Sequence, residues 1–326
     1  MMEWTDRHCR YFHRLLAPHA WLYTEMVTTG ALLHGDVDRH LRYNDEEHPV
    51  ALQLGGSEPA DLAHCARLAA RYGYDEVNLN CGCPSERVQR GAFGACLMAE
   101  PQLVADCVRA MVDAVDLPIT VKHRIGIDKI ESYEFVRDFI GAVAEAGCKT
   151  FIVHARNAWL KGLSPKENRE VPPLRYDVAH RLKQEFPALE ILVNGGLAST
   201  VQIAEQLAHV DGVMIGREAY HHPYALALWE AEFLADPAAD WVPPRRAEVL
   251  RALAVYAERE LRARGTPVRN VVRHILGLYN GLPRARAFRR LLSDATQLRD
   301  ADASLILRAM ALVERDLDQV SEVDEA

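Results

Sequence analysis

The thiol of Cys83 is the side chain in this sequence best suited to chemistry. It lies between Gly82 and Pro84 in the segment EVNLNCGCPSERVQRGAFGACLM, residues 76–98. The apolar residues that begin this segment predict a buried strand, and the asparagines and glycines after them predict a loop. Loops that follow parallel strands carry the reacting groups of many α/β enzymes. We therefore interpret Cys83 as a proton donor or a nucleophile.

Two other interpretations of Cys83 stay open. It could bind a metal together with Cys81, but a single C-x-C without a second pair of ligands is a weak zinc signal. It could also be a small buried apolar side chain, which is how we interpret five of the other cysteines: Cys9, Cys65, Cys96, Cys107 and Cys148.

The elements that must position this thiol alternate between strands and helices. Mostly apolar runs predict strands at residues 22–27, 50–54, 76–79, 119–123, 150–154, 191–194 and 212–215. Helix-length stretches at 61–71, 103–115 and 133–145 separate several of them. This alternation predicts a parallel sheet with right-handed crossovers.

Polar residues recur where these strands end. They are Gln53, Asn78, Asn80, Lys122, Arg124, His154, Arg156, Asn194 and Arg217. One polar residue in a buried strand is usually a satisfied core group. Polar groups at the same end of six successive strands instead predict an active site.

Glycines follow the last two predicted strands, at Gly195-Gly196 and at Gly216. Such turns, placed before helix starts, let backbone N–H groups approach an anion. The pattern predicts a site for a phosphate-bearing cofactor or substrate. Lys122 would suit a flavin, because a cation stabilises the reduced, anionic ring.

We predict an α/β fold, a (β/α)₈ TIM barrel with an appended C-terminal helical bundle. Only seven strands are recognisable and a helical pattern at 6–16 precedes them, so we expect the first barrel strand to be truncated. An open doubly wound sheet is the alternative, although no strand leads into a glycine-rich dinucleotide fingerprint. We assign residues 1–242 to the catalytic barrel and 243–326 to the helical domain, with helices at 247–264, 268–279, 284–292 and 303–319.

Composition excludes several classes of protein. The chain has 326 residues, of which 49% are hydrophobic and 26% charged, as in ordinary globular enzymes. No apolar run reaches the roughly 18 residues of a membrane span, and no signal peptide is recognisable, so we expect a cytoplasmic protein.

Seven scattered cysteines indicate reduced thiols. A net charge of −8 gives no hint of nucleic-acid binding, and the dense arginines of 245–290 are most simply a solvated helix face.

Long motifs in this chain resemble the tRNA-dihydrouridine synthases. The motifs lie at 23–31, 48–56, 73–85, 121–128, 153–156, 164–174, 194–196 and 211–220, so the resemblance runs nearly end to end. Three further motifs resemble the branch that modifies uridines 20 and 20a of the tRNA D-loop: TDRHCR at 5–10, SPKENRE at 164–170 and GLPRARAFRRLLS at 281–293.

The resemblance implies an FMN-bound barrel, NADPH as the reductant and a helical domain that binds tRNA. FMN would be held by Met1, Gln53, Lys122, His154, Asn194, Gly195, Gly196, Gly216 and Arg217. Cys83 would be the catalytic residue. The tRNA would be contacted by Asn80, Lys166, Arg169, Arg286 and Arg289. The family's first strand normally touches the flavin, and here only Met1 matches its end.

The implied reaction is hydride transfer to carbon 6 of a flipped-out uracil, with a proton from Cys83. A second hypothesis keeps the flavin barrel but replaces tRNA with a free pyrimidine, as in dihydroorotate or dihydropyrimidine dehydrogenases. A third is a non-catalytic RNA-binding protein that has lost its flavin. We expect tRNA as the partner, with no DNA and no membrane, and a monomeric protein.

Overall fold

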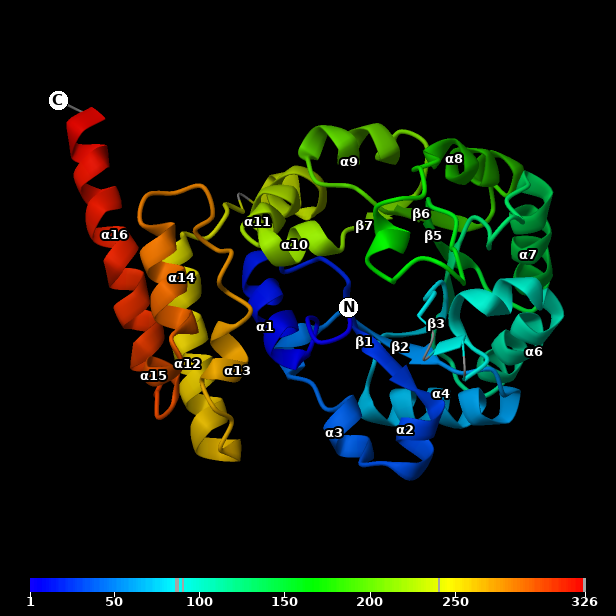
Figure 1. The fold of residues 1–326 in the computed structure, drawn as a ribbon, viewed down its shortest axis with the longest axis horizontal. Helices are drawn as coiled ribbons and strands as arrows, with labels where there is room; N and C mark the ends of the chain where they lie inside the picture. Colours follow the sequence, from blue (N-terminus) through cyan, green and yellow to red (C-terminus); the bar gives the residue numbers. More distant parts are fainter. Residues whose placement is uncertain (86–87, 90, 240, 325–326) are drawn as a thin grey trace. The chain divides into compact units, whose positions relative to one another are not determined.

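The computed structural model describes residues 1–324 apart from 86, 87, 90 and 240. Its centre is a sheet of seven parallel strands that pair in sequential order, β1 to β7 (Figure 1). The strands are β1 (Leu22–Thr28), β2 (Val50–Gly55), β3 (Glu76–Cys81), β4 (Ile119–Arg124), β5 (Thr150–His154), β6 (Glu190–Asn194) and β7 (Gly212–Met214).

The sheet curls and helices cover its outer face, which gives the TIM-barrel architecture that the sequence predicts (Figure 1). The covering helices are α2 (Thr29–His34), α3 (Val37–Leu41), α4 (Pro59–Tyr72), α6 (Pro101–Val112), α7 (Tyr133–Glu145), α8 (Tyr176–Glu185) and α9 (Thr200–Leu207). In the described residues, β1 and β7 are the two edge strands of the sheet.

The strands are hydrophobic because both of their faces are buried. In β2, Val50, Leu52 and Leu54 are fully buried, as are Val77 and Leu79 in β3. Outward-facing strand residues pack with apolar helix residues in one continuous core. All seven strand predictions are confirmed, each to within two residues at either end.

The chain forms two compact units, one of residues 1–2 and 21–216 and one of residues 3–20 and 217–326. The second unit is helical, which confirms the predicted helical region. Its helices include α1 (Arg7–Leu16), α10 (Arg217–His221), α11 (Ala225–Trp229), α12 (Arg246–Arg264), α13 (Arg269–Val272), α14 (Ala285–Ser293), α15 (Ala295–Leu298) and α16 (Ser304–Asp324).

An N-terminal helix completes the core of this second unit. Phe12 and Leu16 of α1 are fully buried among apolar residues of α12, α14 and α16. Asp6 caps α1 by accepting hydrogen bonds from the backbone N–H groups of His8 and Cys9, and it pairs with Arg273 and His274. The assignment of residues 243–326 to tRNA binding stays a prediction.

One predicted helix is wrong. The sequence predicts a helix over 268–279, but α13 covers only Arg269–Val272 and turns follow it. Backbone bonds there mostly span three residues, for example from His274 N to Val271 O, rather than the four of an α-helix. Gly277 also lies against another segment, because a Cβ at this position would fall 2.2 Å from the carbonyl oxygen of His221.

Among the described residues, no helix combines the length and the apolar character needed to cross a membrane.

Candidate active site at the carboxyl ends of the strands

The predicted site residues of neighbouring strands lie opposite one another in the sheet. Asn80 of β3 pairs with Lys122 of β4, and Arg124 of β4 pairs with His154 of β5. His154 in turn pairs with Asn194 of β6. The carboxyl ends of the strands therefore bring an amide, a lysine, an arginine and a histidine to one edge, where parallel barrels carry active sites.

Lys122 donates a hydrogen bond to a neutral partner. Its Nζ lies 2.8 Å from Oδ1 of Asn194, whose own Nδ2 donates to the carbonyl oxygen of Met214 at 2.7 Å. Burial and, to a smaller extent, the charge of Arg124 together lower the pKa of Lys122 to about 7, while Cys83 acts in the opposite direction. An anion bound beside this amine would restore its charge.

His154 lies among cations. It is buried, and its Nδ1 has no hydrogen-bond partner among the described residues. Burial holds its pKa well below the usual range, and nearby positive charges lower it further: Arg124, Lys122, Arg156 and Arg169. A neutral ring with an unpaired nitrogen, set among cations, suits an anionic ligand that accepts or donates a hydrogen bond.

The predicted glycine turn after β6 has the geometry of a close backbone approach. Gly195 and Gly196 have φ of +117° and +72°. Residues that carry a Cβ rarely adopt such positive φ angles. A Cβ on Gly195 would lie 3.3 Å from Cε1 of His154. The hydroxyl of Tyr176 donates to the Gly195 carbonyl at 2.5 Å and fixes the turn.

The two remaining predicted cofactor residues near β7 fall in different units. Gly216 ends the first unit, and the sulfur of Met1 is 3.7 Å from where a Cβ on Gly216 would be. Arg217 begins α10 in the second unit. Its predicted contact with the cofactor stays a prediction.

Cys83 is half-buried in the loop after β3, two residues beyond the strand end. Its thiol lies 3.6 Å from the hydroxyl oxygen of Ser85. Cys81 is instead fully buried in β3. Within the described part of the chain, no group of three or more His, Cys, Asp or Glu side chains is placed to hold a metal ion.

Gln53 and Asn80, predicted to contact cofactor and tRNA respectively, bind each other. The Asn80 Nδ2 donates to the Gln53 Oε1 at 2.9 Å. The Asn80 Oδ1 accepts from the backbone N–H groups of Gly82 and Cys83, each at 3.0 Å. Asn80 is thus tied to the cysteine loop itself.

The role of Arg124 in the site could not be predicted from the sequence. The buried guanidinium donates from Nε to the Gly82 carbonyl at 3.2 Å and from Nη1 to the Asn157 and Asn168 carbonyls at 3.4 and 3.0 Å. One arginine therefore joins the cysteine loop to the loop after β5. An arginine at the end of a buried strand was the available signal.

Lys166 and Arg169 are exposed on either side of a buried asparagine. The amide of Asn168 donates to the carbonyls of Trp159 and Leu163 and accepts from the Trp159 N–H. Asn168 is fully buried, so it anchors the loop that presents the two cations. The roles of Lys166 and Arg169 in binding tRNA stay a prediction.

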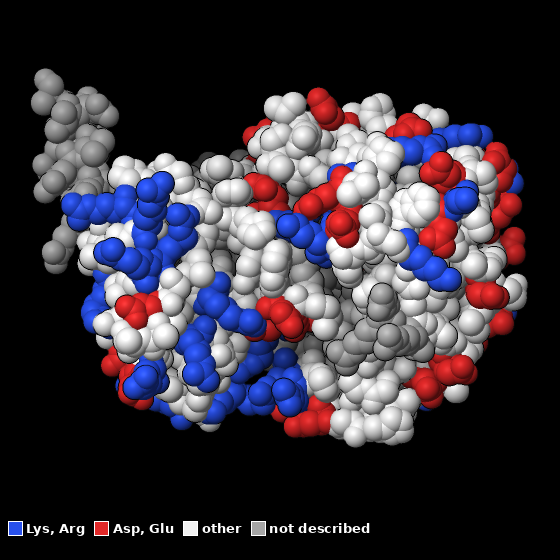
Figure 2. All heavy atoms as spheres, viewed as in Figure 1, with Lys and Arg blue, Asp and Glu red and all other residues white. Residues whose placement is uncertain are grey.

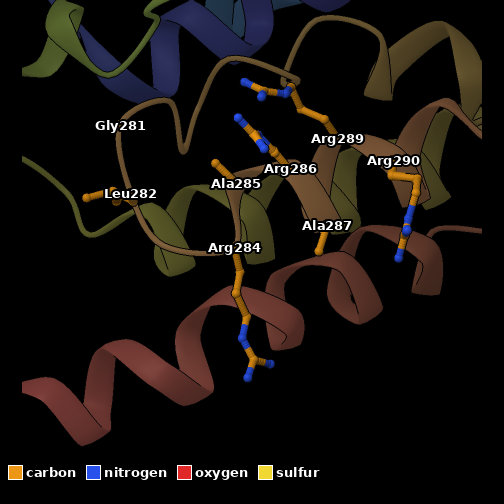
Figure 3. A pocket seen from close by; sticks show the side chains of 8 residues that line it. All are labelled: Gly281, Leu282, Arg284, Ala285, Arg286, Ala287, Arg289 and Arg290. Atoms are coloured by element: carbon orange, nitrogen blue, oxygen red, sulfur yellow. The ribbon is translucent and has the colours of Figure 1, made fainter.

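Arg286 and Arg289 line an open hollow of about 820 Å³ in the helical unit. The buried Ala285, Phe288 and Leu292 turn one face of α14 into the core, so the arginines occupy its other faces. The side chains of Arg286 and Arg289 extend to the same side of α14 (Figure 3). Those of Arg284 and Arg290 point in other directions. Lys and Arg side chains gather over this unit (Figure 2).

Comparisons with known proteins give concordant matches. A family model described as dihydrouridine synthase (Dus) matches residues 1–314. A relative from Pseudomonas aeruginosa named tRNA-dihydrouridine(20/20a) synthase is 60% identical over 293 residues, which is 90% of this chain and 87% of the relative. Relatives of the same name from Yersinia pestis and Vibrio vulnificus are 56% and 54% identical and cover 96% and 98% of this chain, and 90% and 96% of their own lengths.

Among solved structures, a 2-naphthoyl-CoA reductase bound to 2-naphthoyl-CoA resembles the fold. The TM-score is 0.52 at 12% identity, and the likeness covers 70% of this chain and 47% of the other. At this identity the likeness bears on the fold alone.

Proposed function

Because the chain belongs to the dihydrouridine synthase family, we propose that it reduces uridine to 5,6-dihydrouridine at positions 20 and 20a of the tRNA D-loop. The cofactor in this proposal is FMN, the electron donor is NADPH, and Cys83 is the proton donor. The relatives that share more than half of their residues with this chain carry the name of this activity, which supports the choice of substrate.

The residues at the strand ends fit a phosphate-bearing flavin. Lys122 would stabilise negative charge on the ring, and His154 has an unpaired nitrogen to offer a ligand. Gly195 and Gly196 leave room for a phosphate to reach the backbone, and Met1, Gln53, Asn194, Gly216 and Arg217 complete the proposed set. When bound, FMN would carry hydride from NADPH to carbon 6 of the uracil.

Cys83 would complete the reaction by proton transfer. As hydride reaches carbon 6, negative charge develops at carbon 5, and the S–H bond of Cys83 breaks to form the new C–H bond there. The thiolate then regains a proton from solvent. Lys122 and Arg124 lie near enough to Cys83 for their pKa values to respond to its charge, so they would stabilise the thiolate between these steps.

The tRNA would be held by cations of both units and by Asn80. Lys166 and Arg169 lie on the anchored loop of the barrel unit, and Arg286 and Arg289 lie on α14. The target base must leave its stack to reach the thiol, and the unpaired D-loop makes this easier than in a duplex. We propose that the enzyme acts as a monomer in the cytoplasm, where tRNA is modified.

The observation that carries the proposal is the position of Cys83, held in a loop at the carboxyl end of β3 beside the strand that carries Lys122 and Arg124. The test is single-turnover reduction of unmodified tRNA by the NADPH-reduced enzyme without oxygen, with Cys83→Ala compared with Cys96→Ala. Both variants should bind FMN and accept electrons from NADPH. Cys83→Ala should form dihydrouridine at least about 100-fold more slowly, the range expected for loss of a general acid.

The same assay separates the competing functions. Wild-type product yield from Cys83→Ala would remove the proton donor from the proposal. Turnover of free uridine as fast as tRNA would favour a free-pyrimidine enzyme, and a colourless protein that binds tRNA without reducing it would favour a non-catalytic role.

A further inference from the structure

A continuous chain of hydrogen bonds links the amino end of β3 to the cysteine loop. We name it the Glu76–Asn80 chain; its members are Glu76, Thr120, Asn78, Gln53 and Asn80. Its successive donor–acceptor distances are 2.6, 2.8, 2.9 and 2.9 Å. Glu76, Thr120 and Asn78 are buried, so these polar groups depend on one another for partners.

The donor and the acceptor of each bond in the chain can be assigned in order, starting at Glu76. The Glu76 Oε1 accepts from the hydroxyls of both Tyr23 and Thr120, so Thr120 gives its single hydroxyl hydrogen to Glu76. The Thr120 oxygen then accepts from the Asn78 Nδ2, which turns the Asn78 Oδ1 toward the Gln53 Nε2.

The remaining two amides follow from the same rule. The Gln53 Oε1 faces Asn80 and accepts from its Nδ2, so the Asn80 Oδ1 points to the other side. There it accepts from the backbone N–H groups of Gly82 and Cys83. The bond to Gln53 on one side and the backbone N–H groups on the other therefore require the same orientation of the Asn80 amide.

Other bonds hold the same stretch of backbone. The Cys83 carbonyl accepts from the Ala95 N–H at 2.9 Å, and the Gly82 carbonyl accepts from the Arg124 Nε at 3.2 Å. With Asn80 in place, the N–H and C=O groups of both residues have protein partners. Without it, two N–H groups lose their acceptor at once.

We propose that Asn80 is a positioning residue for Cys83, and that Glu76 sets the orientation of Asn80 through the hydrogen-bond chain inside the barrel. This inference rests on the proposed function for its catalytic meaning, because a fixed thiol matters where it must face one carbon of the uracil. It adds that the thiol's position depends on a carboxylate at the opposite end of the strand.

Thr120 offers matched variants for a test. Thr120→Val keeps the shape of the side chain but can neither donate to Glu76 nor accept from Asn78, whereas Thr120→Ser keeps both bonds. Tyr23→Phe is the control for Glu76, because the Tyr23 hydroxyl donates to the same oxygen at 2.9 Å but stands outside the chain. Asn80→Ala removes the last link directly and does not alter the buried end.

The readout is the rate of alkylation of Cys83 by iodoacetamide, resolved by mass spectrometry in the full-length protein. Cys96 is also half-buried and serves as the internal reference. Thr120→Val should raise the Cys83 rate about fivefold relative to Cys96, as expected for loss of one hydrogen bond. Asn80→Ala should raise it at least as much, because the N–H groups of Gly82 and Cys83 both lose their acceptor. Thr120→Ser and Tyr23→Phe should leave the ratio of the two alkylation rates unchanged. Thr120→Val and Asn80→Ala should also speed hydrogen exchange of the backbone amides in the peptide that contains Gly82 and Cys83.

An unchanged Cys83-to-Cys96 ratio in folded Asn80→Ala would overturn the inference, as would equal acceleration of both thiols, which indicates general loosening. If only Thr120→Val lacks an effect, the part assigned to Glu76 is wrong. Alkylation does not require turnover. A failure of the proposed reaction therefore remains distinguishable from a failure of the positioning role.

Discussion

At the scale of single residues, the site is defined by cations that have neutral partners. Lys122 donates to an asparagine amide and Arg124 to three backbone carbonyls. Buried cations are usually paired with carboxylates, because desolvation disfavours the charged form. The positive potential of Lys122 and Arg124 can therefore attract an anionic ligand. This is the physical reason for proposing an anionic cofactor at this site.

Lys122 should make stability rise with pH. Its pKa is about 7 in the folded chain against an ordinary 10.5, so between these values the unfolded chain binds more protons. This proton linkage should therefore make Lys122→Met more stable than wild type by about 4 kcal/mol at pH 7, and the gain should shrink towards pH 10.

Urea unfolding of the flavin-free proteins at pH 7, 8.5 and 10 measures this difference. Lys129→Met is the control, because Lys129 is exposed. A stability difference that stays constant across this range would contradict the lowered pKa of Lys122.

At the scale of elements, two loops of the barrel unit are joined through Arg124. The cysteine loop follows β3, and the loop that carries Lys166 and Arg169 follows β5. Because Arg124 donates to backbone carbonyls of both, movement of one loop strains bonds to the other. The thiol and the proposed tRNA contacts are therefore mechanically connected.

Arg124→Lys should loosen the loop after β5, because one ammonium cannot reproduce the planar fork that meets three carbonyls. We expect trypsin to cut after Lys161 and Lys166 about tenfold faster, the factor that corresponds to roughly 1.4 kcal/mol. Site-resolved limited proteolysis provides the measurement.

Arg175→Lys is the matched control for this variant. Among the described residues, the Arg175 side chain makes only long polar contacts, at 3.5 and 3.9 Å, and the lysine that replaces it is still a trypsin site. Equal cleavage of the two variants would show that Arg124 does not hold the loop.

Much of this architecture was predictable because the strands are buried on both faces and read as apolar runs. The polar residues near their carboxyl ends, from Gln53 to Asn194, were predicted from their positions and from the family's motifs. The part of Asn168 was not predictable, since its role depends on backbone groups brought near it by folding. The helix expected at 268–279 failed because apolar spacing does not separate α-helical turns from successive tighter ones.

At the scale of the whole molecule, the chain is a member of the dihydrouridine synthase family, as its motifs indicated. It combines a barrel unit with a helical unit whose arginines cluster on α14. The net charge of −8 conceals this cluster (Figure 2). For an anionic polymer, the local distribution of charge decides binding.

If Arg286 and Arg289 bind tRNA as proposed, replacing both with alanine should weaken tRNA binding about 10-fold or more at low salt, because each substitution would remove a proposed phosphate contact. The slope of log K against log salt should fall by about two. Fluorescence anisotropy across a salt series provides both numbers.

Arg262→Ala is the control here, because its side chain is 78% exposed on α12 and paired with Glu258. An unchanged salt slope in the double variant would remove α14 from the tRNA-binding surface.

The helical unit is discontinuous in sequence, and this has a consequence for its synthesis. The ribosome releases α1 first, whereas α12, α14 and α16, among which Phe12 and Leu16 are buried, follow only after the whole barrel segment. Until then the apolar side of α1 has nothing from its own unit to cover it. The nascent chain can therefore complete its barrel unit early, but α1 stays unpartnered until α12, α14 and α16 have been synthesised.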